Sequence, residues 1–206
     1  LLRTAKYVSH TQGIPKIIDF QDAFSKGIER RLETDPSYLR PVLQSELKRL
    51  SKYEQTVFKQ FDNCTIISEQ DRDQLSVHEK NDVAVVRNGV ELQDFKPSSQ
   101  KKTVDILFAG NMGYPPNVEG AVFLAKRVMP LVRKQVPNAN LRLAGARPDQ
   151  KVRELQSELT EVTGWVDDIR DCYAQAKVFV APMMIGTGLQ NKLLEAMAMK
   201  LPCVTS

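Results

Sequence analysis

The sequence predicts an α/β protein built on parallel, doubly wound sheets. From residue 103 onward, short β-branched runs alternate with longer segments of helical periodicity, an order typical of parallel sheets covered by helices. Three of the short runs end in a glycine, at Gly110, Gly145 and Gly164. In such folds ligands bind at this edge of the sheet, so the same segments are candidates for a binding site.

The chain is expected to contain two domains. In residues 1–88, β-branched runs predict strands at 15–20, 64–67 and 82–86. Residues 89–102 are polar and contain a proline, so we assign them to a linker. Residues 103–206 form the second domain, with strands expected at 104–109, 141–144, 160–163, 177–181 and 202–205.

Helices are expected between these strands. Residues 26–61 have a helical pattern that we expect to break at Asp35-Pro36 and at Pro41. Ser68 has the sequence context of an N-cap for a helix over residues 69–75. In the second domain, helices are expected at 117–135 with Asn117 as N-cap, at 149–157, at 167–175 and after the glycine loop near residue 188.

The second half of the 26–61 region is amphipathic. Apolar residues recur with the helical period at Leu43, Leu47, Leu50, Tyr53, Val57 and Phe61. The opposite face carries Lys48, Arg49, Lys52 and Lys59. A solvated helix face is the simpler interpretation. A surface that contacts a membrane or an acceptor is the alternative.

The composition excludes several functional classes. The 206 residues are 42% hydrophobic, and no stretch approaches the ~20 apolar residues of a membrane span. A net charge of +4 is too small to argue for a nucleic-acid partner. Cys64, Cys172 and Cys203 have neither metal-ligand spacing nor the pattern of a disulfide framework. They indicate a reducing compartment, and no signal peptide is visible.

The strongest candidate site is the stretch 184–199. A loop containing Gly186 and Gly188 leads into a helix that is almost entirely apolar after Lys192, yet Glu195 lies in its middle. A buried carboxylate needs a hydrogen-bond partner or neutralisation. The free N–H groups of a glycine loop at a helix start suit a phosphate. We therefore predict a nucleotide here, with its phosphate on the loop and a hydroxyl-rich group on Glu195.

Helical spacing places Gly188, Asn191, Lys192 and Glu195 on one face, with Gln190 beside it. The simpler alternatives are an ion pair between Lys192 and Glu195 and a plain turn at the glycines. The strand just before the loop favours a ligand site. The turn that follows Gly110 is weaker evidence, because it lacks a complete dinucleotide fingerprint.

Motifs spread through most of the chain also follow a characteristic order. They are Phe61-Asp62 to Ser68-Glu69 with Arg72, Asn88-Gly89-Val90-Glu91, Phe108-Ala109-Gly110, Leu143-Ala144-Gly145, Gly164-Trp165-Val166 to Tyr173, Ala181-Pro182, and Leu194-Glu195-Ala196-Met197-Ala198. In this order they resemble the retaining glycosyltransferases of family 4, which have the two-domain GT-B fold. The nearest branch is one of bacterial sugar transferases linked to surface or exopolysaccharide assembly.

The resemblance implies an enzyme that moves a hexosyl group from a nucleotide-diphosphate sugar to a glycan or lipid-linked acceptor with retention of configuration. It implies a cytoplasmic protein, at the inner face of the membrane if it associates with one. No metal or other cofactor is expected. It further implies that both Rossmann-like domains are incomplete in these 206 residues, so that this piece alone would be inactive.

The resemblance also assigns donor-binding residues. Glu195 matches a glutamate that binds the ribose hydroxyls, and Trp165 and Val166 would bracket the base. Thr187 stands where the family has a second, sugar-facing glutamate. A phosphate-binding pair that begins with Gly-Arg in the family falls on Asn111, so Lys192 would supply the charge. The other donor-binding candidates are Gly110, Gly188, Gln190 and Asn191.

On the acceptor side, Gln21 falls on a histidine of the family, and Asp22 follows it. We take Asp22 and Gln21 as candidate catalytic residues, facing the sugar or acceptor together with Asp19. The departures at Gln21, Asn111 and Thr187 leave two alternatives open. One is a catalytically silent module that binds a nucleotide-sugar, and the other is a nucleotide-sugar epimerase of the same fold.

Overall fold

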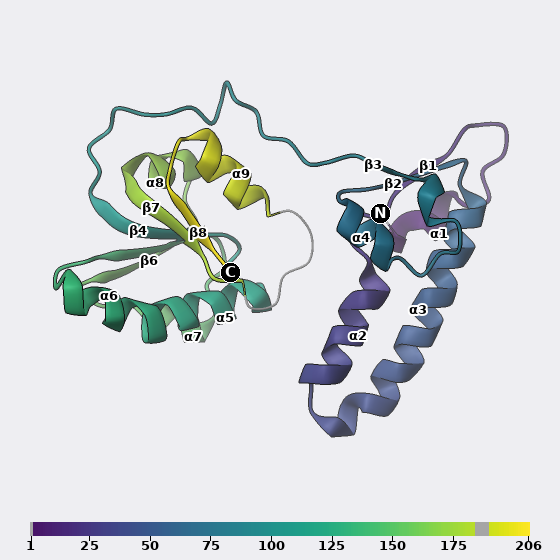
Figure 1. Cartoon of the computed structure of the whole chain (residues 1–206), viewed down its shortest axis with the longest axis horizontal. Helices are drawn as coiled ribbons and strands as arrows, with labels where there is room; N and C mark the ends of the chain where they lie inside the picture. The colour runs from purple at the N-terminus through teal and green to yellow at the C-terminus, as the bar shows by residue number, and fades with distance from the viewer. Residues whose placement is uncertain (1, 184–189) are drawn as a thin grey trace. The chain divides into compact units, whose positions relative to one another are not determined.

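The structure is a computed structural model that describes residues 2–183 and 190–206. The chain divides into two compact units, with the boundary between Asn88 and Gly89. Each unit contains a parallel sheet with its own helices and its own apolar core (Figure 1). The predicted α/β class is therefore confirmed.

The first unit is built on a parallel sheet with the strand order β1-β2-β3. The strands are β1 (Ile17–Asp19), β2 (Asn63–Ile66) and β3 (Val83–Val85). Ile18 pairs with Cys64, and Thr65 pairs with Ala84. Phe20, at the end of β1, is fully buried in the core beneath the sheet. Each strand lies where the sequence predicts it, although β1 and β3 are shorter.

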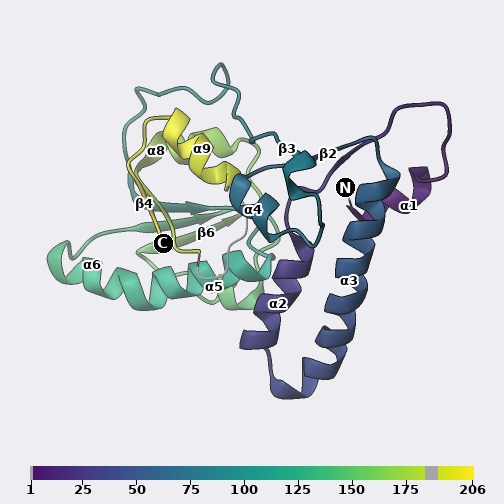
Figure 2. The same cartoon turned by 45° about the vertical axis from the view of Figure 1, so that its right-hand side comes forward.

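The helices of this unit are α1 (Ala5–Val8), α2 (Phe24–Thr34), α3 (Arg40–Gln60) and α4 (Glu69–Gln74), with 3₁₀ helices at Leu2–Thr4, Ser37–Leu39 and Lys80–Asp82. Helices α2 and α3 form a hairpin that extends away from the strands (Figures 1 and 2).

The predicted break at Asp35-Pro36 is observed. The predicted break at Pro41 is wrong, because Pro41 lies in the first turn of α3, where its missing N–H leaves no helical bond unmade. Ser68 caps α4 as predicted, accepting a hydrogen bond from the Asp71 N–H at 3.0 Å.

A buried carboxylate joins the two helices of the hairpin. Glu54, on α3, accepts hydrogen bonds from the backbone N–H of Ser25 at 2.9 Å and from its hydroxyl at 2.7 Å. The first N–H groups of a helix have no partner within it, so Glu54 accepts a hydrogen bond that α2 itself cannot provide at its start.

Of the predicted apolar stripe, Leu43 and Val57 are buried and the others are half-buried. The four basic residues of the opposite face are exposed, which agrees with both interpretations of this face.

The second unit is built on a parallel sheet with the strand order β6-β5-β4-β7-β8. The strands are β4 (Val104–Ala109), β5 (Leu141–Ala144), β6 (Thr160–Gly164), β7 (Ala176–Ala181) and β8 (Cys203–Thr205). Phe108 pairs with Leu143 across β4 and β5, and Ile106 pairs with Val178 across β4 and β7. All of these strands agree with the sequence prediction to within a residue at each end.

The helices of this unit are α5 (Pro115–Phe123), α6 (Met129–Gln135), α7 (Gln150–Arg153), α8 (Ile169–Gln175) and α9 (Asn191–Ala198). Helices α5, α6 and α7 cover one face of the sheet, and α8 and α9 cover the other (Figure 1). A π-helical turn at Leu124–Val128 connects α5 to α6. The prediction that Asn117 is an N-cap is wrong, because the helix begins at Pro115 and Asn117 is buried within it. Helix α7 is shorter than predicted and is capped by Asp149.

Residues 89–102 pack with the second unit. The Phe95 ring lies against its apolar core. The Lys102 ammonium donates to the carbonyl of Ala174 at 2.8 Å, and Asp94 pairs with Arg170 at 3.6 Å. This connecting segment is thus held along α8. Among the helices described, none is both long and apolar enough to cross a bilayer.

Candidate functional site

A pocket of about 570 Å³ lies at the carboxyl ends of β4, β5 and β6. Its volume is within the range of roughly 300–1,000 Å³ typical of small-molecule sites. The strand order reverses between β4 and β7, which places the pocket beside a topological switch point. Its lining residues come from three strand ends and two helices and are Ala109, Gly110, Asn111, Gly145, Ala146, Arg147, Trp165, Val166, Asp167, Ile169, Tyr173, Lys192 and Glu195.

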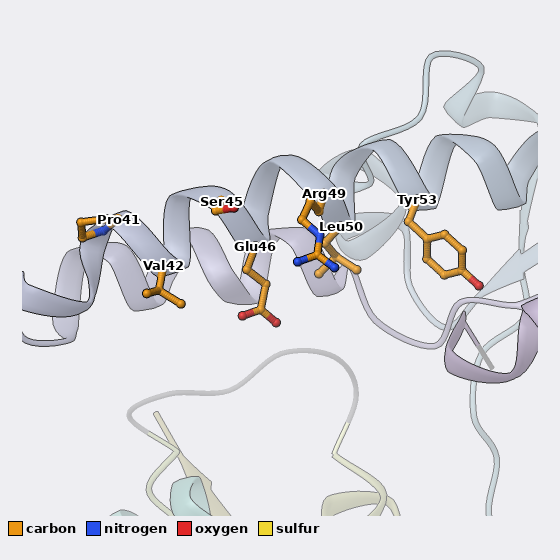
Figure 3. A pocket seen from close by; sticks show the side chains of 7 residues that line it. All are labelled: Pro41, Val42, Ser45, Glu46, Arg49, Leu50 and Tyr53. Atoms are coloured by element: carbon orange, nitrogen blue, oxygen red, sulfur yellow. The ribbon is translucent and has the colours of Figure 1, made fainter.

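A larger hollow of about 850 Å³ runs along α3 in the first unit. Among the described residues, its lining comes from that one helix, and Val42, Glu46, Arg49 and Tyr53 project from the same side of it (Figure 3). Within residues 2–183 and 190–206, polar groups from different elements converge at the strand ends of the second unit and not along α3. We therefore place the candidate site in the second unit.

The floor of the site is backbone. Gly110 and Gly145, which follow β4 and β5, have φ values of +155° and +141°, where side-chain-bearing residues are rare. A Cβ on Gly145 would lie 1.8 Å from the carbonyl oxygen of Gly110. A Cβ on Gly110 would lie 3.3 Å from the Lys192 ammonium. Glycine at both positions therefore lets the two strand ends, and the lysine, approach each other closely.

Lys192, on the first turn of α9, is a half-buried cation of the site. Its Nζ donates to Asn117 Oδ1 at 2.6 Å and lies 4.8 Å from the centroid of the Phe108 ring. Burial lowers the pKa of Lys192 to about 8, against the opposing effect of the Glu195 charge. No carboxylate of the described residues lies within ion-pair distance of this amine, so the ion pair with Glu195 is not formed. The cation is available to an anionic ligand.

Glu195 is hydrogen-bonded, as the sequence predicts for a carboxylate in an apolar helix. The Tyr173 hydroxyl, on α8, donates to Glu195 Oε2 at 2.8 Å. Burial, and then the charge of Glu195, raises the pKa of Tyr173, so the hydroxyl keeps its proton and acts as the donor. The sequence predicts that a partner must exist. It does not identify Tyr173, because that residue lies on another helix.

The rim of the pocket carries further polar and aromatic groups. Trp165 follows β6 and is 76% exposed, with Val166 and Asp167 after it. Arg147 follows β5 with a left-handed backbone, at φ +51°. Sequence reasoning overlooked Arg147, although its position two residues after the glycine of a strand end was a usable signal. Arg147 brings a second cation to a pocket that already contains Lys192.

Of the donor-binding residues predicted from the sequence, the pocket brings together Gly110, Asn111, Trp165, Val166, Lys192 and Glu195. Gln190 is the N-cap of α9 and Asn191 is its first residue. Thr187 and Gly188 lie outside the described residues. Asn117 was predicted only as a helix cap, and the structure makes it the hydrogen-bond partner of Lys192.

The candidate catalytic residues Gln21 and Asp22 lie in the first unit, just after β1. Gln21 has a left-handed backbone, at φ +63°, and its N–H donates to Asp19 Oδ1 at 3.1 Å. The pKa of Asp22 is raised by burial, and the neighbouring carboxylates of Asp71 and Asp19 add to the effect. Within residues 2–183 and 190–206, no group of three or more His, Cys, Asp or Glu side chains is placed to hold a metal ion.

In open α/β sheets ligands bind at the topological switch point, and here a cation and a carboxylate on one helix line the pocket beside it. The sequence model of the family described as glycosyl transferases group 1 matches residues 103–206, and the chain belongs to this family. A relative from Klebsiella pneumoniae, named an uncharacterized 44.6 kDa protein in the cps region, is 28% identical over 102 residues, which cover 45% of this chain and 26% of that protein.

Solved structures show the same architecture. HepE of Anabaena, in complex with UDP and glucose, aligns with a TM-score of 0.73 at 13% identity, over 100% of this chain and 57% of its own. TarM of S. aureus, in a complex that includes UDP, aligns with a TM-score of 0.62 at 16% identity, over 76% of this chain and 32% of its own. These similarities confirm the predicted GT-B fold. The chain thus spans a quarter to about half of the proteins it matches.

Proposed function

We propose that the full-length protein transfers a hexosyl group from a nucleotide-diphosphate sugar to a glycan or lipid-linked acceptor. The observation that carries the proposal is the joint placement of Lys192 and Glu195 on one helix, above a backbone floor and beside three strand ends. Membership of the glycosyl transferases group 1 supports it. So do the UDP complexes of HepE and TarM.

The donor's diphosphate would lie against Lys192 and the start of α9. Negative charge builds on the diphosphate as the bond to the sugar breaks, and a desolvated cation stabilises such charge more than water does. The N–H groups and the dipole at the start of α9 add to this stabilisation. Arg147 provides a second positive charge at the rim.

The nucleoside would be bound by the strand ends. Glu195 would accept hydrogen bonds from the ribose hydroxyls, with its carboxylate already held by Tyr173. Trp165 and Val166 would bracket the base. No metal or other cofactor is required in this proposal, since Lys192 and the helix start carry the charge of the diphosphate.

We further propose family 4 membership and retention of anomeric configuration, on the resemblance described above. Gln21 and Asp22 would then face the sugar or acceptor. The cps-region relative supports a role in polysaccharide assembly. Retention is checked by NMR of the first product formed: the opposite anomer would contradict it, and a free epimerised nucleotide-sugar would identify an epimerase instead.

Replacing Glu195 by alanine in the full-length enzyme is expected to weaken donor binding about tenfold or more, because hydrogen bonds to a charged group contribute roughly 1.5–3 kcal/mol. Titration calorimetry with nucleotide-diphosphate sugars measures the loss. Glu158→Ala, which removes an exposed carboxylate of the same unit, is the matched control and should bind the donor normally. Donor binding within twofold of wild type in the Glu195 variant would refute the site. Donor binding without transfer to any acceptor would identify a silent binding module.

A cytoplasmic location at the inner face of the membrane is part of the proposal. The α2–α3 hairpin turns at residues 35–39, and Tyr38 in this turn and Val42 just after it are 76% and 63% exposed. Exposed Arg40 and Lys48 lie on the same hairpin. Aromatic and apolar side chains beside basic ones suit the boundary of an anionic bilayer.

The double replacement Tyr38→Ser and Val42→Ser is therefore expected to lower the binding constant for vesicles of phosphatidylglycerol about 30-fold, measured by co-sedimentation, because about 2 kcal/mol of apolar burial is lost. Leu131→Ser, which removes an exposed apolar side chain of the second unit, is the control. Equal sedimentation of wild type and double variant would contradict a membrane contact at the hairpin turn.

A further inference from the structure

The Tyr173 ring packs against two other aromatic rings. It lies between Phe179 of β7, at a centroid distance of 5.5 Å, and Phe95, at 6.3 Å in an edge-to-face arrangement. Tyr173 is fully buried. Packed aromatic rings of this kind have little freedom to reorient, and edge-to-face pairs add to the stabilisation from burial. The position of the hydroxyl is therefore set by the core of the unit.

The hydroxyl has one proton and two acceptors within reach. Glu195 Oε2 lies at 2.8 Å, and the carbonyl oxygen of Lys192 lies at 3.3 Å. The carboxylate is the nearer acceptor and carries the charge, so it receives the proton. Among the described residues, no hydrogen bond engages the second carboxylate oxygen, Oε1. One oxygen of Glu195 is thus fixed by Tyr173, and the residue itself lines the pocket.

Phe95 brings the connecting segment into this arrangement. It lies within residues 89–102, which are tied to α8 by Asp94 on Arg170, by Gln100 on Asp171 at 3.4 Å and by Lys102 on the Ala174 carbonyl. These contacts place Phe95 against the one tyrosine that holds Glu195. Tyr173 therefore contacts both the connecting segment, through Phe95, and the Glu195 carboxylate, through its hydroxyl.

We propose that Tyr173, braced by Phe95 of the connecting segment, is a positioning residue that orients Glu195 toward the ribose of the donor. The inference rests on the proposed function, since it requires that Glu195 bind ribose. It predicts that removing the Tyr173 hydroxyl weakens binding only of ligands that have ribose hydroxyls. A loss of general structural integrity would instead weaken all nucleotides alike.

The experiment is titration calorimetry on the full-length protein with UDP, GDP and ADP and with the 2′,3′-dideoxy form of each. For the nucleotide that wild type binds most tightly, Tyr173→Phe is expected to lose about tenfold or more in affinity, the size of a hydrogen bond to a charged group. The dideoxy form should bind wild type and variant within twofold of each other. In turnover, KM for the donor should rise while kcat stays within twofold.

Phe95→Leu should weaken binding in the same direction by about two- to threefold, and the double variant should be no weaker than Tyr173→Phe alone, because the two side chains act through one contact. Tyr53→Phe, in the first unit, and Leu92→Ala, on the exposed side of the connecting segment, are the matched controls. Both should bind the nucleotides as wild type does.

The outcomes separate the inference from the function on which it rests. If wild type prefers the ribose form and Tyr173→Phe keeps the whole preference, the positioning role is overturned and the proposed function stands. Equal losses for ribose and dideoxy forms also overturn it. If wild type binds none of the three nucleotides, or does not distinguish ribose from dideoxyribose, the proposed ribose site fails and the inference fails with it.

Discussion

Replacing Gly145 by alanine is expected to destabilise the second unit by about 3 kcal/mol or more, the sum of overpacking and a strained backbone. The added Cβ would lie 1.8 Å from the carbonyl oxygen of Gly110, so one of the two strand ends must move. Both ends line the pocket, and nucleotide binding should be lost along with stability. Urea unfolding followed by circular dichroism measures the change in the free energy of unfolding.

Two other glycines separate the causes of this loss. Gly164→Ala introduces a side chain at φ +69° but meets no atom within 4 Å, so it should cost only the backbone strain of about 1 kcal/mol. Gly27→Ala, in the open interior of α2, should stabilise the first unit by about 0.5–1 kcal/mol. If Gly145→Ala were no worse than Gly164→Ala, the close approach of the two strand ends would not be the constraint we describe.

Replacing Lys192 by glutamine is expected to lower kcat/KM of the full-length enzyme about 100-fold, the size typically found when one preorganised electrostatic group is removed from a reacting centre. Glutamine retains hydrogen-bonding capacity near Asn117 but removes the charge that we propose for binding the diphosphate. Steady-state turnover of the donor measures the effect. Lys134→Gln, on the exposed end of α6, is the matched control and should retain full activity.

The same lysine should make donor binding depend on pH. Its pKa in the folded protein is about 8, below the ordinary 10.5, and a bound diphosphate would raise it again. Donor affinity should therefore be constant below about pH 8 and fall above it, as binding comes to require uptake of a proton. Calorimetry between about pH 7 and 9 tests this, since the diphosphate of a nucleotide-sugar does not titrate in that interval.

The effect on stability has the opposite sign. Below about pH 8 the amine is charged in the folded and unfolded chain alike, and the cost of burying the charge is fully present. Between about pH 8 and 10.5 the folded state has lost its proton and the unfolded state keeps it, so stability increases with pH. Lys192→Gln should abolish both dependences. A donor affinity in wild type that rose with pH would contradict the role of Lys192.

The sequence predicts the fold of the second unit well because its strands and helices are regular. Four of its five strands are short, mostly apolar runs, and β6 is recognised instead by its threonines, Val162 and the glycine that ends it. The helix residues Val118 and Ala121 are buried. The errors are local. Asn117 is a residue type that favours the N-cap position, but the helix begins two residues earlier, at Pro115. The side-chain amide of Asn117 instead accepts a hydrogen bond from Lys192.

The candidate site could be predicted only in part, because its interactions cross between elements. The rule that a buried carboxylate needs a partner correctly indicated that Glu195 is hydrogen-bonded. The partner, Tyr173, is 22 residues away on another helix, and no periodicity within one helix identifies it. Arg147 is different, because its position two residues after Gly145 at a strand end was a usable sequence signal, and the structure places it in the same pocket.

The position of Trp165 has a practical consequence. It is the single tryptophan among the 206 residues, and it lies at the rim of the pocket with 76% of its surface exposed. The fluorescence emission of an indole changes when a bound ligand covers a ring that was exposed to solvent in the free protein. The chain therefore carries its own fluorescent reporter at the site under test, and nucleotide binding to this unit can be followed without a label.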